Sequence, residues 1–417
     1  MNFFSTTIPR GLMRAAIFAG LAMTPFVCPA PARAQSDIPI GVIMPITGRE
    51  ARPGQYSREG IELAIKQVND GGGIYIKSLN KKLPIREVFY DDGSDGARSA
   101  SLAERAMSSD NVVAVIGGYS TALGEPESVM PDRYKTPWIT PGAAASSIFS
   151  KGYQYIFGTL SSVENLGYTT GEFLGWLVDQ GKLKKGLKVA LAVENTDHGI
   201  DYVTGIEKWI GEHPGYFTVV FDEKFPLGGT DFSGLLQKVK ATHADIFLSD
   251  AHLQDYVTMQ RQYLQAGMYH QVVSYGARGP EADARKGLGA GVDYIVAGIW
   301  WSRDLGYPQV KKFNADYTAF TGHAPDSWYA APAYDAMRML AQSIEKAGSL
   351  DKTAIRDQLR AGELKGSILP SQTVKFGKGG QVANPFVIVQ NKPDGKVDIV
   401  FPPDAATGPA VAPMPRP

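Results

Sequence analysis

The sequence predicts an α/β protein built from two similar halves in tandem. Its 417 residues exceed one ordinary domain and are enough for two, each with its own core. From Ile38 onward, short β-rich segments alternate with amphipathic helical segments, which is typical of strand–helix units in a mainly parallel sheet. Two such series follow each other, so we expect two sheets.

The first series begins with a strand at 38–44, which ends at Pro45. A helix follows and ends at the glycines 71–73, because apolar residues recur in it at helical spacing. These residues are Ile61, Ala64, Ile65 and Val68. The other strands of this half, separated by helical segments, are expected at 83–90, 112–116 and 138–140.

The second series repeats this pattern further along the chain. Its strands are predicted at 188–193, 217–225, 245–248, 272–275 and 294–300, and the helices between them at 199–213, 231–242 and 253–266. The last third begins with helices at 308–321, 330–347 and 352–361 and closes with strands near 373–376, 386–390 and 397–401. Residues 403–417 are rich in proline and alanine, which predicts a disordered tail.

The first 34 residues are typical of a signal peptide. Arg10 and Arg14 precede an apolar run at 15–27, and Ala32 and Ala34 fit a cleavage site before Gln35. The apolar run is shorter than the roughly 20 residues of a membrane-spanning helix, and no later segment comes close. We therefore expect an exported, periplasmic protein that is not inserted in a membrane.

The only cysteine, Cys28, lies within this predicted signal peptide. It is either a bystander or a lipidated first residue, and Val27 before it argues against lipidation, which requires a small residue there. The mature chain then has no thiol for a disulfide, a thiolate nucleophile or a cysteine metal site.

Charge and motifs argue against several function classes. Lys plus Arg equal Asp plus Glu at 42 each, so no basic excess predicts a nucleic acid or an anionic membrane as partner. The chain has no phosphate-binding loop, its calcium-like turn at 91–96 has Leu102 where a loop glutamate belongs, and its six histidines form no HxxxH pair. No metal and no cofactor are predicted.

The strongest enzyme alternative is a secreted serine hydrolase built on Ser120. This serine follows a predicted strand in the segment 118–122, as in a nucleophile elbow. However, Ala122 replaces the glycine that such a turn needs, and the sequence assigns no His or Asp partner.

Four segments in order resemble the leucine/isoleucine/valine-binding branch of the periplasmic binding proteins. They are 40–48 with the helix 60–69, then 90–92, then 116–120, and finally 139–143 leading to 151–153. The resemblance implies two Rossmann-like lobes joined by three crossovers, with lobe 1 at 37–158 plus 302–381 and lobe 2 at 159–301 plus 382–402. It also implies a monomeric substrate-binding component of an ABC importer, whose partners are a small carboxylate and the permease subunits. Amide sensors and receptor ectodomains share this fold, so binding without transport is an alternative.

The resemblance also implies site residues. In the first lobe, Tyr119, Ser120 and Thr121 match the contacts to the ligand carboxylate, and Gly142, Ala143 and Ala144 match a loop with further polar contacts. His198, His252 and Tyr329 match aromatic pocket residues. Independently, ligands of α/β proteins bind beyond the carboxyl ends of parallel strands, where helix N-termini offer N–H donors. Helix capping by Ser120 and Thr121, and simple packing of the rings, are the alternatives.

Departures from the family pattern bear on the ligand. Amino-acid binders of this family hold the ammonium with acidic groups and a threonine, but Val163, Gly276 and Ala144 stand near those places. Glu164 or Asp250 could compensate, since a buried ammonium without a counter-charge is costly. The predicted cleft is also rich in rings, and Arg278 could clamp a carboxylate. These rings are Tyr56, Tyr119, His198, His252, Trp300, Trp301, Trp328 and Tyr329. The predicted ligand is therefore a branched-chain or hydrophobic amino acid or a related carboxylate, or alternatively an aromatic acid or amide without an amine.

Overall fold

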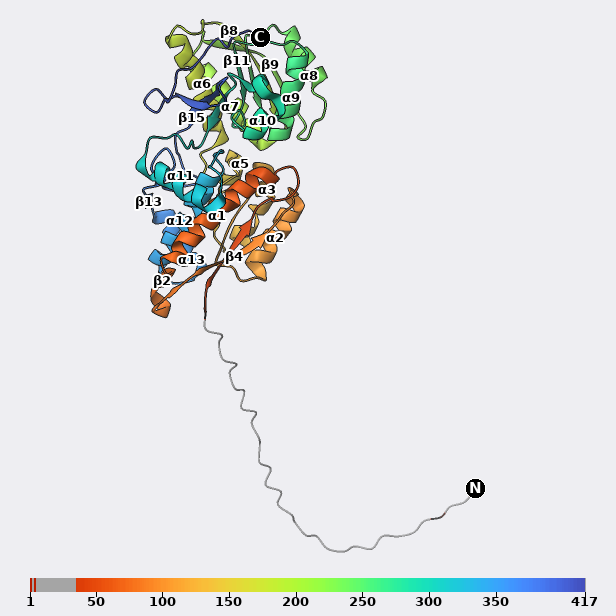
Figure 1. The fold of residues 1–417 in the computed structure, drawn as a ribbon. Coiled ribbons are helices and arrows are strands. Elements are labelled where there is room, and N and C mark those ends of the chain that lie inside the picture. The colour runs from red at the N-terminus through yellow and green to blue at the C-terminus, as the bar shows by residue number, and fades with distance from the viewer. Residues whose placement is uncertain (2–3, 5–34, 417) are drawn as a thin grey trace. The chain divides into compact units, whose positions relative to one another are not determined.

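The structure is a computed structural model that describes residues 1, 4 and 35–416, and the chain from Ser36 onward forms one compact unit (Figure 1). The predicted signal peptide, with Cys28, lies outside the described residues apart from residues 1 and 4.

The first sheet is parallel throughout and has the strand order β4-β1-β5-β6-β7. Its strands are β1 (Ile38–Ile43), β4 (Ile85–Tyr90), β5 (Ala114–Gly117), β6 (Trp138–Thr140) and β7 (Ile156–Gly158). Alternate residues of β1 pack against helices on opposite faces, Ile40 in one core cluster and Ile43 in another. Such coverage of both faces is the reason why the strands of a parallel sheet are apolar almost throughout.

The helices of this lobe come from both ends of the chain. They are α1 (Ala51–Asp70), α2 (Gly96–Ser108), α3 (Thr121–Glu127), α4 (Met130–Arg133), α5 (Ser146–Phe149), α11 (Pro308–Thr321), α12 (Ala330–Ala347) and α13 (Lys352–Ala361). α12 packs along α1 and against β5, and α2 packs beside β1 and β5. A short pair, β13 (Leu364–Lys365) and β14 (Thr373–Val374), follows α13.

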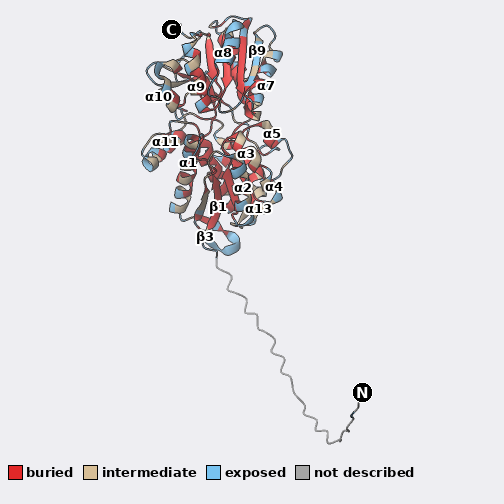
Figure 2. Cartoon of the chain, turned by 90° about the vertical axis from the view of Figure 1, so that its right-hand side faces the viewer, coloured by how far each residue is buried: buried red, intermediate tan, exposed pale blue. Residues whose placement is uncertain are grey.

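The second sheet has the order β16-β15-β12-β11-β10-β8-β9, and β15 alone runs against the other strands, antiparallel to its neighbours β12 and β16. Its strands are β8 (Leu187–Glu194), β9 (Phe217–Phe225), β10 (Ile246–Asp250), β11 (Val272–Tyr275), β12 (Val296–Ile299), β15 (Val387–Asn391) and β16 (Val397–Phe401). Its helices are α6 (Val163–Asp179), α7 (Asp197–Glu212), α8 (Ser233–Ala241), α9 (Leu253–Gln265), α10 (Ala282–Leu288) and the 3-10 turn η2 (Gly289–Val292). Figure 2 shows the inner strands of both sheets as buried, while the edge strand β9 is partly exposed and the helices carry most of the exposed residues.

The chain passes between the two sheets three times, after β7, after β12 and after β14. The predicted fold class, two mainly parallel α/β lobes joined by three crossovers, is therefore confirmed. In each sheet the carboxyl ends of the parallel strands lie at one edge, and the loops after β5, β6, β8, β10 and β11 are the candidates for a binding site.

Two details differ from the sequence prediction. The strand expected at 83–90 is divided, because Pro84 has no N–H to continue the ladder. Leu83 ends a short hairpin of β2 (Ile74–Ile76), the 3-10 turn η1 (Lys77–Leu79) and β3 (Lys81–Leu83), and β4 begins at Ile85.

The prediction of a disordered tail at 403–417 is wrong for the part that the structure describes. Ala410 is only 4% exposed, the Val411 N–H donates to Oε1 of Gln390 at 2.9 Å, and the Met414 N–H donates to the Gln271 carbonyl at 2.8 Å. The segment adds no strand, but its backbone groups find partners along the second sheet, which composition alone does not reveal.

Candidate functional site

The loop after β5 carries the three residues that the resemblance assigned to the ligand carboxylate. Tyr119, Ser120 and Thr121 are all buried. Ser120 is the N-cap residue of α3, but its side chain makes no capping hydrogen bond, so the capping alternative does not explain it. Thr121 is engaged within the lobe, because its Oγ1 accepts the Ala144 N–H at 3.4 Å.

The loop after β6 does not offer polar groups as expected. The N–H groups of Gly142 and Ala143 donate to Oγ1 of Thr140 at 3.3 and 2.8 Å, and Ala144 donates to Thr121. A Cβ atom at Gly142 would lie 2.6 Å from the ring of Tyr119. The loop therefore positions the Tyr119 ring, and the expectation that its three residues contact the ligand through polar groups gains no support.

A buried carboxyl group, Glu127, lies beneath the β5 loop. It forms hydrogen bonds with the Ser99 hydroxyl and, at 2.8 Å, with Nε1 of Trp138. Burial raises the pKa of Glu127 to about 8, so this carboxyl is largely protonated at pH 7.

We expect Glu127→Gln to reduce the loss in free energy of unfolding that the wild type shows as pH rises toward 8. A raised pKa in the folded state means that folding favours the protonated form, so the stability present below pH 4.5 is lost as pH rises through 8. The glutamine cannot ionise, and at pH 8 the variant should exceed the wild type by roughly 1–3 kcal/mol in free energy of unfolding. Urea titrations of both proteins at pH 6 and 8 measure the free energy of unfolding. A wild type that is equally stable at both pH values would contradict the prediction.

Two histidine–carboxylate pairs lie at neighbouring strand ends of the second sheet. Nδ1 of His198 lies 2.5 Å from Oδ2 of Asp250, and Nδ1 of His252 lies 2.5 Å from Oε2 of Glu194. Asp250 and Glu194 end the paired strands β10 and β8. Asp250, a candidate for an ammonium ligand, is therefore already paired, and a Cβ atom at Gly276 would lie 2.0 Å from its Oδ1. The glycine at a position where the family has an acid leaves room for the Asp250 carboxylate.

The pair of His252 and Glu194 is charged. Burial opposes both charges, but Glu194 and Glu50 raise the pKa of His252 to about 9, and His252 lowers the pKa of Glu194 to about 2. His252 is thus an imidazolium at neutral pH, with Nδ1–H directed at Glu194.

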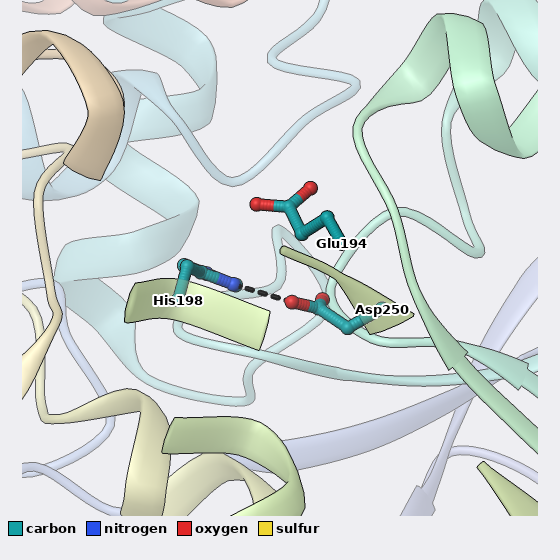
Figure 3. A group of neighbouring side chains, drawn as sticks. All are labelled: Glu194, His198 and Asp250. Atoms are coloured by element: carbon teal, nitrogen blue, oxygen red, sulfur yellow. Dashed lines mark hydrogen bonds and ion pairs between the residues drawn. The ribbon is translucent and has the colours of Figure 1, made fainter. Parts of the chain in front are cut away.

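Three of these side chains also have the donor set of a metal site. Ligand atoms of Glu194, His198 and Asp250 lie within 4.8 Å of one another (Figure 3). However, the oxygens of Glu194 accept from His252 and Thr196, and Asp250 binds His198. A metal would have to displace these partners, so the absence of a metal site stays our prediction.

Arg278, in the loop after β11, is the most unusual residue of the site. It is 4% exposed, and its Nη1 atom has no hydrogen-bond partner in the described part of the chain. No described carboxylate forms an ion pair with it, although its guanidinium lies 5.7–6.0 Å from three ring centroids. These rings are Tyr119, Trp328 and Tyr329.

Two other donors near Arg278 share this lack of a partner, the hydroxyl of Tyr119 and Nε2 of His252, as does Nε1 of Trp301 in the core. The rings of Tyr119 and Tyr329 meet edge to face at 5.3 Å, and the Tyr329 hydroxyl donates to Glu281 of the other lobe. Burial raises the pKa of Glu281 to about 7. Donors from both lobes that have no protein partner thus face one buried region, which also contains the carboxyl groups of Glu50 and Glu281.

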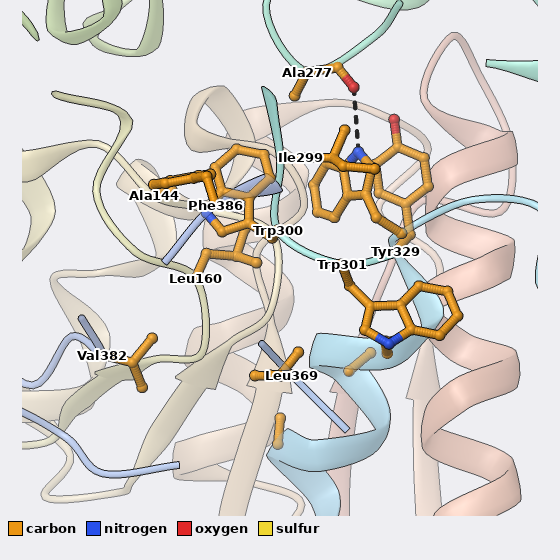
Figure 4. Packing of buried hydrophobic residues seen from close by; sticks show 14 of the residues in the cluster. Ala144, Leu160, Ala277, Ile299, Trp300, Trp301, Tyr329, Leu369, Val382 and Phe386 are labelled. Carbon is orange, nitrogen blue, oxygen red and sulfur yellow. Dashed lines mark hydrogen bonds between the residues drawn. The ribbon is translucent and has the colours of Figure 1, made fainter. Parts of the chain in front are cut away.

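The remaining predicted residues are distributed more widely. Trp300 donates to the Ser161 carbonyl at 3.0 Å, and Trp301 packs on Phe313, so both rings fill the core near the crossovers (Figure 4). Tyr56 lies edge to face with His323 at 5.8 Å within the first lobe. Glu164 is paired with Lys208 at 3.3 Å on the surface of α6 and is not part of the site.

Several direct contacts join the lobes. Nη2 of Arg49 lies 3.2 Å from Oδ2 of Asp255, and the Ser146 N–H donates to Asp201 at 2.6 Å. Glu50, next to Arg49, lies 3.8 Å from Nε2 of His252. The structure therefore represents a state in which the lobes are closed on each other.

Arg49→Ala should speed ligand release while leaving association nearly unchanged. The Arg49–Asp255 pair exists only when the lobes are closed, and the Gly228 N–H still satisfies Asp255 at 3.0 Å. We expect the dissociation rate to rise roughly 5-fold, as for a partly exposed ion pair. Stopped-flow tryptophan fluorescence measures the rate. Arg52→Ala is the matched control because its pair with Asp283 is exposed and 3.8 Å long. Equal release from the Arg49 variant and the wild type would contradict the prediction.

Comparisons with known proteins agree with this geometry. The profile of the periplasmic binding protein family matches residues 37–396. The Leu/Ile/Val-binding protein homolog 8 of Brucella suis is 26% identical over 413 residues, which cover 96% of this chain and 98% of that protein. A leucine-binding protein of Thermotoga maritima has a TM-score of 0.75 at 21% identity, with 87% of this chain and 97% of that chain covered.

A solute-binding protein of Rhodopseudomonas palustris, solved with 4-hydroxybenzoate, has a TM-score of 0.73 at 21% identity, covering 87% of this chain and 95% of that chain. No helix in the described part of the chain combines the length and apolarity needed to span a bilayer. With a family profile that spans most of its length and the fold of solved binding proteins, this chain belongs to the periplasmic binding protein family.

Proposed function

We propose that this protein is the substrate-binding component of an ABC importer and holds a small organic carboxylate between its lobes. The observation that carries this proposal is the buried Arg278 guanidinium, which forms no salt bridge in the described chain and whose Nη1 has no hydrogen-bond partner, although Glu281 and Asp250 are near enough to act on its charge. A buried, unpaired charge costs several kcal/mol, and a carboxylate would offset that cost with charge-assisted hydrogen bonds. The surrounding rings would cover the carbon skeleton of the ligand.

The site favours an acid without an amine. Asp250 and Glu194 already form hydrogen bonds with histidines, and an ammonium that binds Glu50 would lie beside the His252 imidazolium, a like charge. An amino acid is the second candidate, because the Brucella relative carries the Leu/Ile/Val-binding name and a neighbour in fold is a leucine-binding protein. Another neighbour binds 4-hydroxybenzoate, so the fold by itself does not choose between these ligands.

The proposed mechanism needs no covalent step. The open lobes rotate about the crossovers, the ligand carboxylate meets Arg278, and closure forms the contacts of Arg49 with Asp255 and of Tyr329 with Glu281. A permease would then recognise the closed form. In this proposal the protein works as a monomer in the periplasm, after cleavage of the predicted signal peptide.

A non-enzymatic role predicts that Ser120 affects binding alone. The purified protein should hydrolyse neither p-nitrophenyl esters nor amides above the rate of buffer, and Ser120→Ala should only weaken binding, by roughly 3- to 10-fold for one lost hydrogen bond. Esterase assays and calorimetry on both proteins test this. Turnover that disappears in Ser120→Ala would instead establish the hydrolase alternative.

The direct test of the proposed function is the identification of what the protein carries. Native mass spectrometry of protein purified without denaturation should show a bound small acid, and calorimetry should then show its binding. If no small acid copurifies and the protein binds neither hydrophobic amino acids nor aromatic acids, the proposal is wrong.

A further inference from the structure

A second polar subsite lies between Glu50 and His252. The two side chains come from opposite lobes, are 6% and 4% exposed, and carry opposite charges. Oε1 of Glu50 is nevertheless 3.8 Å from Nε2 of His252, too far for a hydrogen bond. Nε2 has no other partner among the described residues.

Each of the two groups also has a partner within its own lobe. Nδ1 of His252 binds Glu194 at 2.5 Å, and Nε of Arg49 lies 3.4 Å from the same Oε1 of Glu50. Whatever satisfies Nε2 must therefore approach from the space between the lobes. It must accept a hydrogen bond from an imidazolium and donate one to a carboxylate.

A water molecule meets both demands in the ligand-free protein, but few groups of a small acid that displaces it do. A hydroxyl has one donor and two acceptor lone pairs, so it can bridge a cationic donor and an anionic acceptor. An ammonium has no lone pair and would meet the imidazolium as a like charge, and a methyl group would leave both partners unsatisfied. A carboxylate would be repelled by Glu50. The residues thus select for a hydroxyl.

We infer that Glu50 and His252 form a subsite for a hydroxyl group of the ligand, so that the preferred ligand is a hydroxylated carboxylic acid. This inference rests on the proposed function, because it assumes that the ligand carboxylate binds Arg278. It adds a specificity determinant that neither Arg278 nor the surrounding rings provide.

The experiment compares matched pairs of acids by calorimetry. The probes are benzoate with 3- and 4-hydroxybenzoate, and leucine with its 2-hydroxy analogue, 2-hydroxy-4-methylpentanoate. In the wild type, at least one hydroxy acid should bind about 10-fold or more tightly than its parent, since hydrogen bonds to charged groups are strong. The 2-hydroxy acid is compared with two compounds. Leucine carries an amine in place of the hydroxyl, and 4-methylpentanoate, the parent acid, has neither group.

Variants of Glu50 test whether this residue causes the tighter binding of the hydroxy acid relative to its parent acid. Glu50→Ala should bring the affinity for the hydroxy acid down to that for its parent, while the parent changes less than about 3-fold. Glu50→Gln keeps an acceptor and should restore part of the gain. Glu62→Ala is the matched control, a partly exposed glutamate of the helix α1 that Glu50 precedes; it pairs with Arg58 and should keep the full gain.

The outcomes separate this inference from the proposed function. If hydroxy acids and parents bind the wild type equally, or if Glu50→Ala keeps the gain, the subsite holds no ligand hydroxyl and the inference is wrong, while carboxylate binding stands. If leucine binds most tightly and Glu50→Ala abolishes its binding, Glu50 holds an ammonium and the inference is also wrong. If none of the acids binds the wild type, the proposed function fails.

Discussion

Replacing Arg278 with methionine is expected to weaken binding of the ligand acid by at least about 100-fold. The guanidinium is the only group in the described site with full positive charge and no protein anion within ion-pair distance. Truncating one member of a buried charge pair costs roughly 2–5 kcal/mol in binding free energy. Methionine keeps the apolar stem but not the guanidinium, so it removes the charge with a limited change of packing near the backbone. Calorimetry with the acid identified by mass spectrometry gives the dissociation constant.

The stability of Arg278→Met should not fall with its affinity for the ligand. Removing a buried charge that has no partner should leave the free energy of unfolding of the ligand-free protein unchanged or higher. Arg303→Met serves as a control because Arg303 pairs with exposed Asp326. A general loss of stability in Arg278→Met would mean that the arginine supports the fold rather than the ligand, and unchanged affinity would place the carboxylate elsewhere.

His252→Ala should destabilise the ligand-free protein by roughly 3–5 kcal/mol, the cost of leaving one partner of a buried ion pair alone. The variant leaves the Glu194 carboxylate in the core with the Thr196 hydroxyl as its remaining hydrogen-bond donor and with His198 nearby. Urea unfolding at pH 7, followed by circular dichroism, measures the change. The double variant His252→Ala, Glu194→Gln should recover part of the loss, because it removes the buried charge.

The pH profile provides an independent check of this pair. His252 has its pKa raised from 6.5 to about 9, so its contribution is complete below pH 6.5 and is lost as pH rises through 9. Glu194 has its pKa lowered from 4.5 to about 2, so its contribution is complete above pH 4.5 and is lost as pH falls through 2. His243→Asn, at an exposed histidine, should leave the profile as in the wild type. A His252→Ala profile that parallels the wild type would contradict this account.

Strand periodicity and turn residues were sufficient to predict the two lobes. Inner strands such as β1 and β8 are apolar runs at the expected places, because they are covered on both faces, whereas the edge strand β9 alternates in burial. The tail was mispredicted for a physical reason. Residues such as Val411 and Met414 are held by backbone hydrogen bonds to distant strands, which no local pattern encodes.

The candidate site was predictable only in part. The positions of Tyr119, His198 and Arg278 after strands placed them at one edge of their sheets, since parallel strands end together. Contacts between residues of the two lobes could not be predicted from the sequence in this way. Glu50 and Glu281 lie in different lobes, and their partners become visible only when the lobes close. Glu194 did carry a signal, because it ends a strand next to the strand that Asp250 ends.

A crystal structure of the protein with its copurified ligand tests the central claim most directly. The account predicts a ligand carboxylate between the lobes, with an oxygen about 2.7–3.0 Å from the guanidinium of Arg278. A ligand that lacks an anionic group, or one whose carboxylate lies away from Arg278, would contradict it.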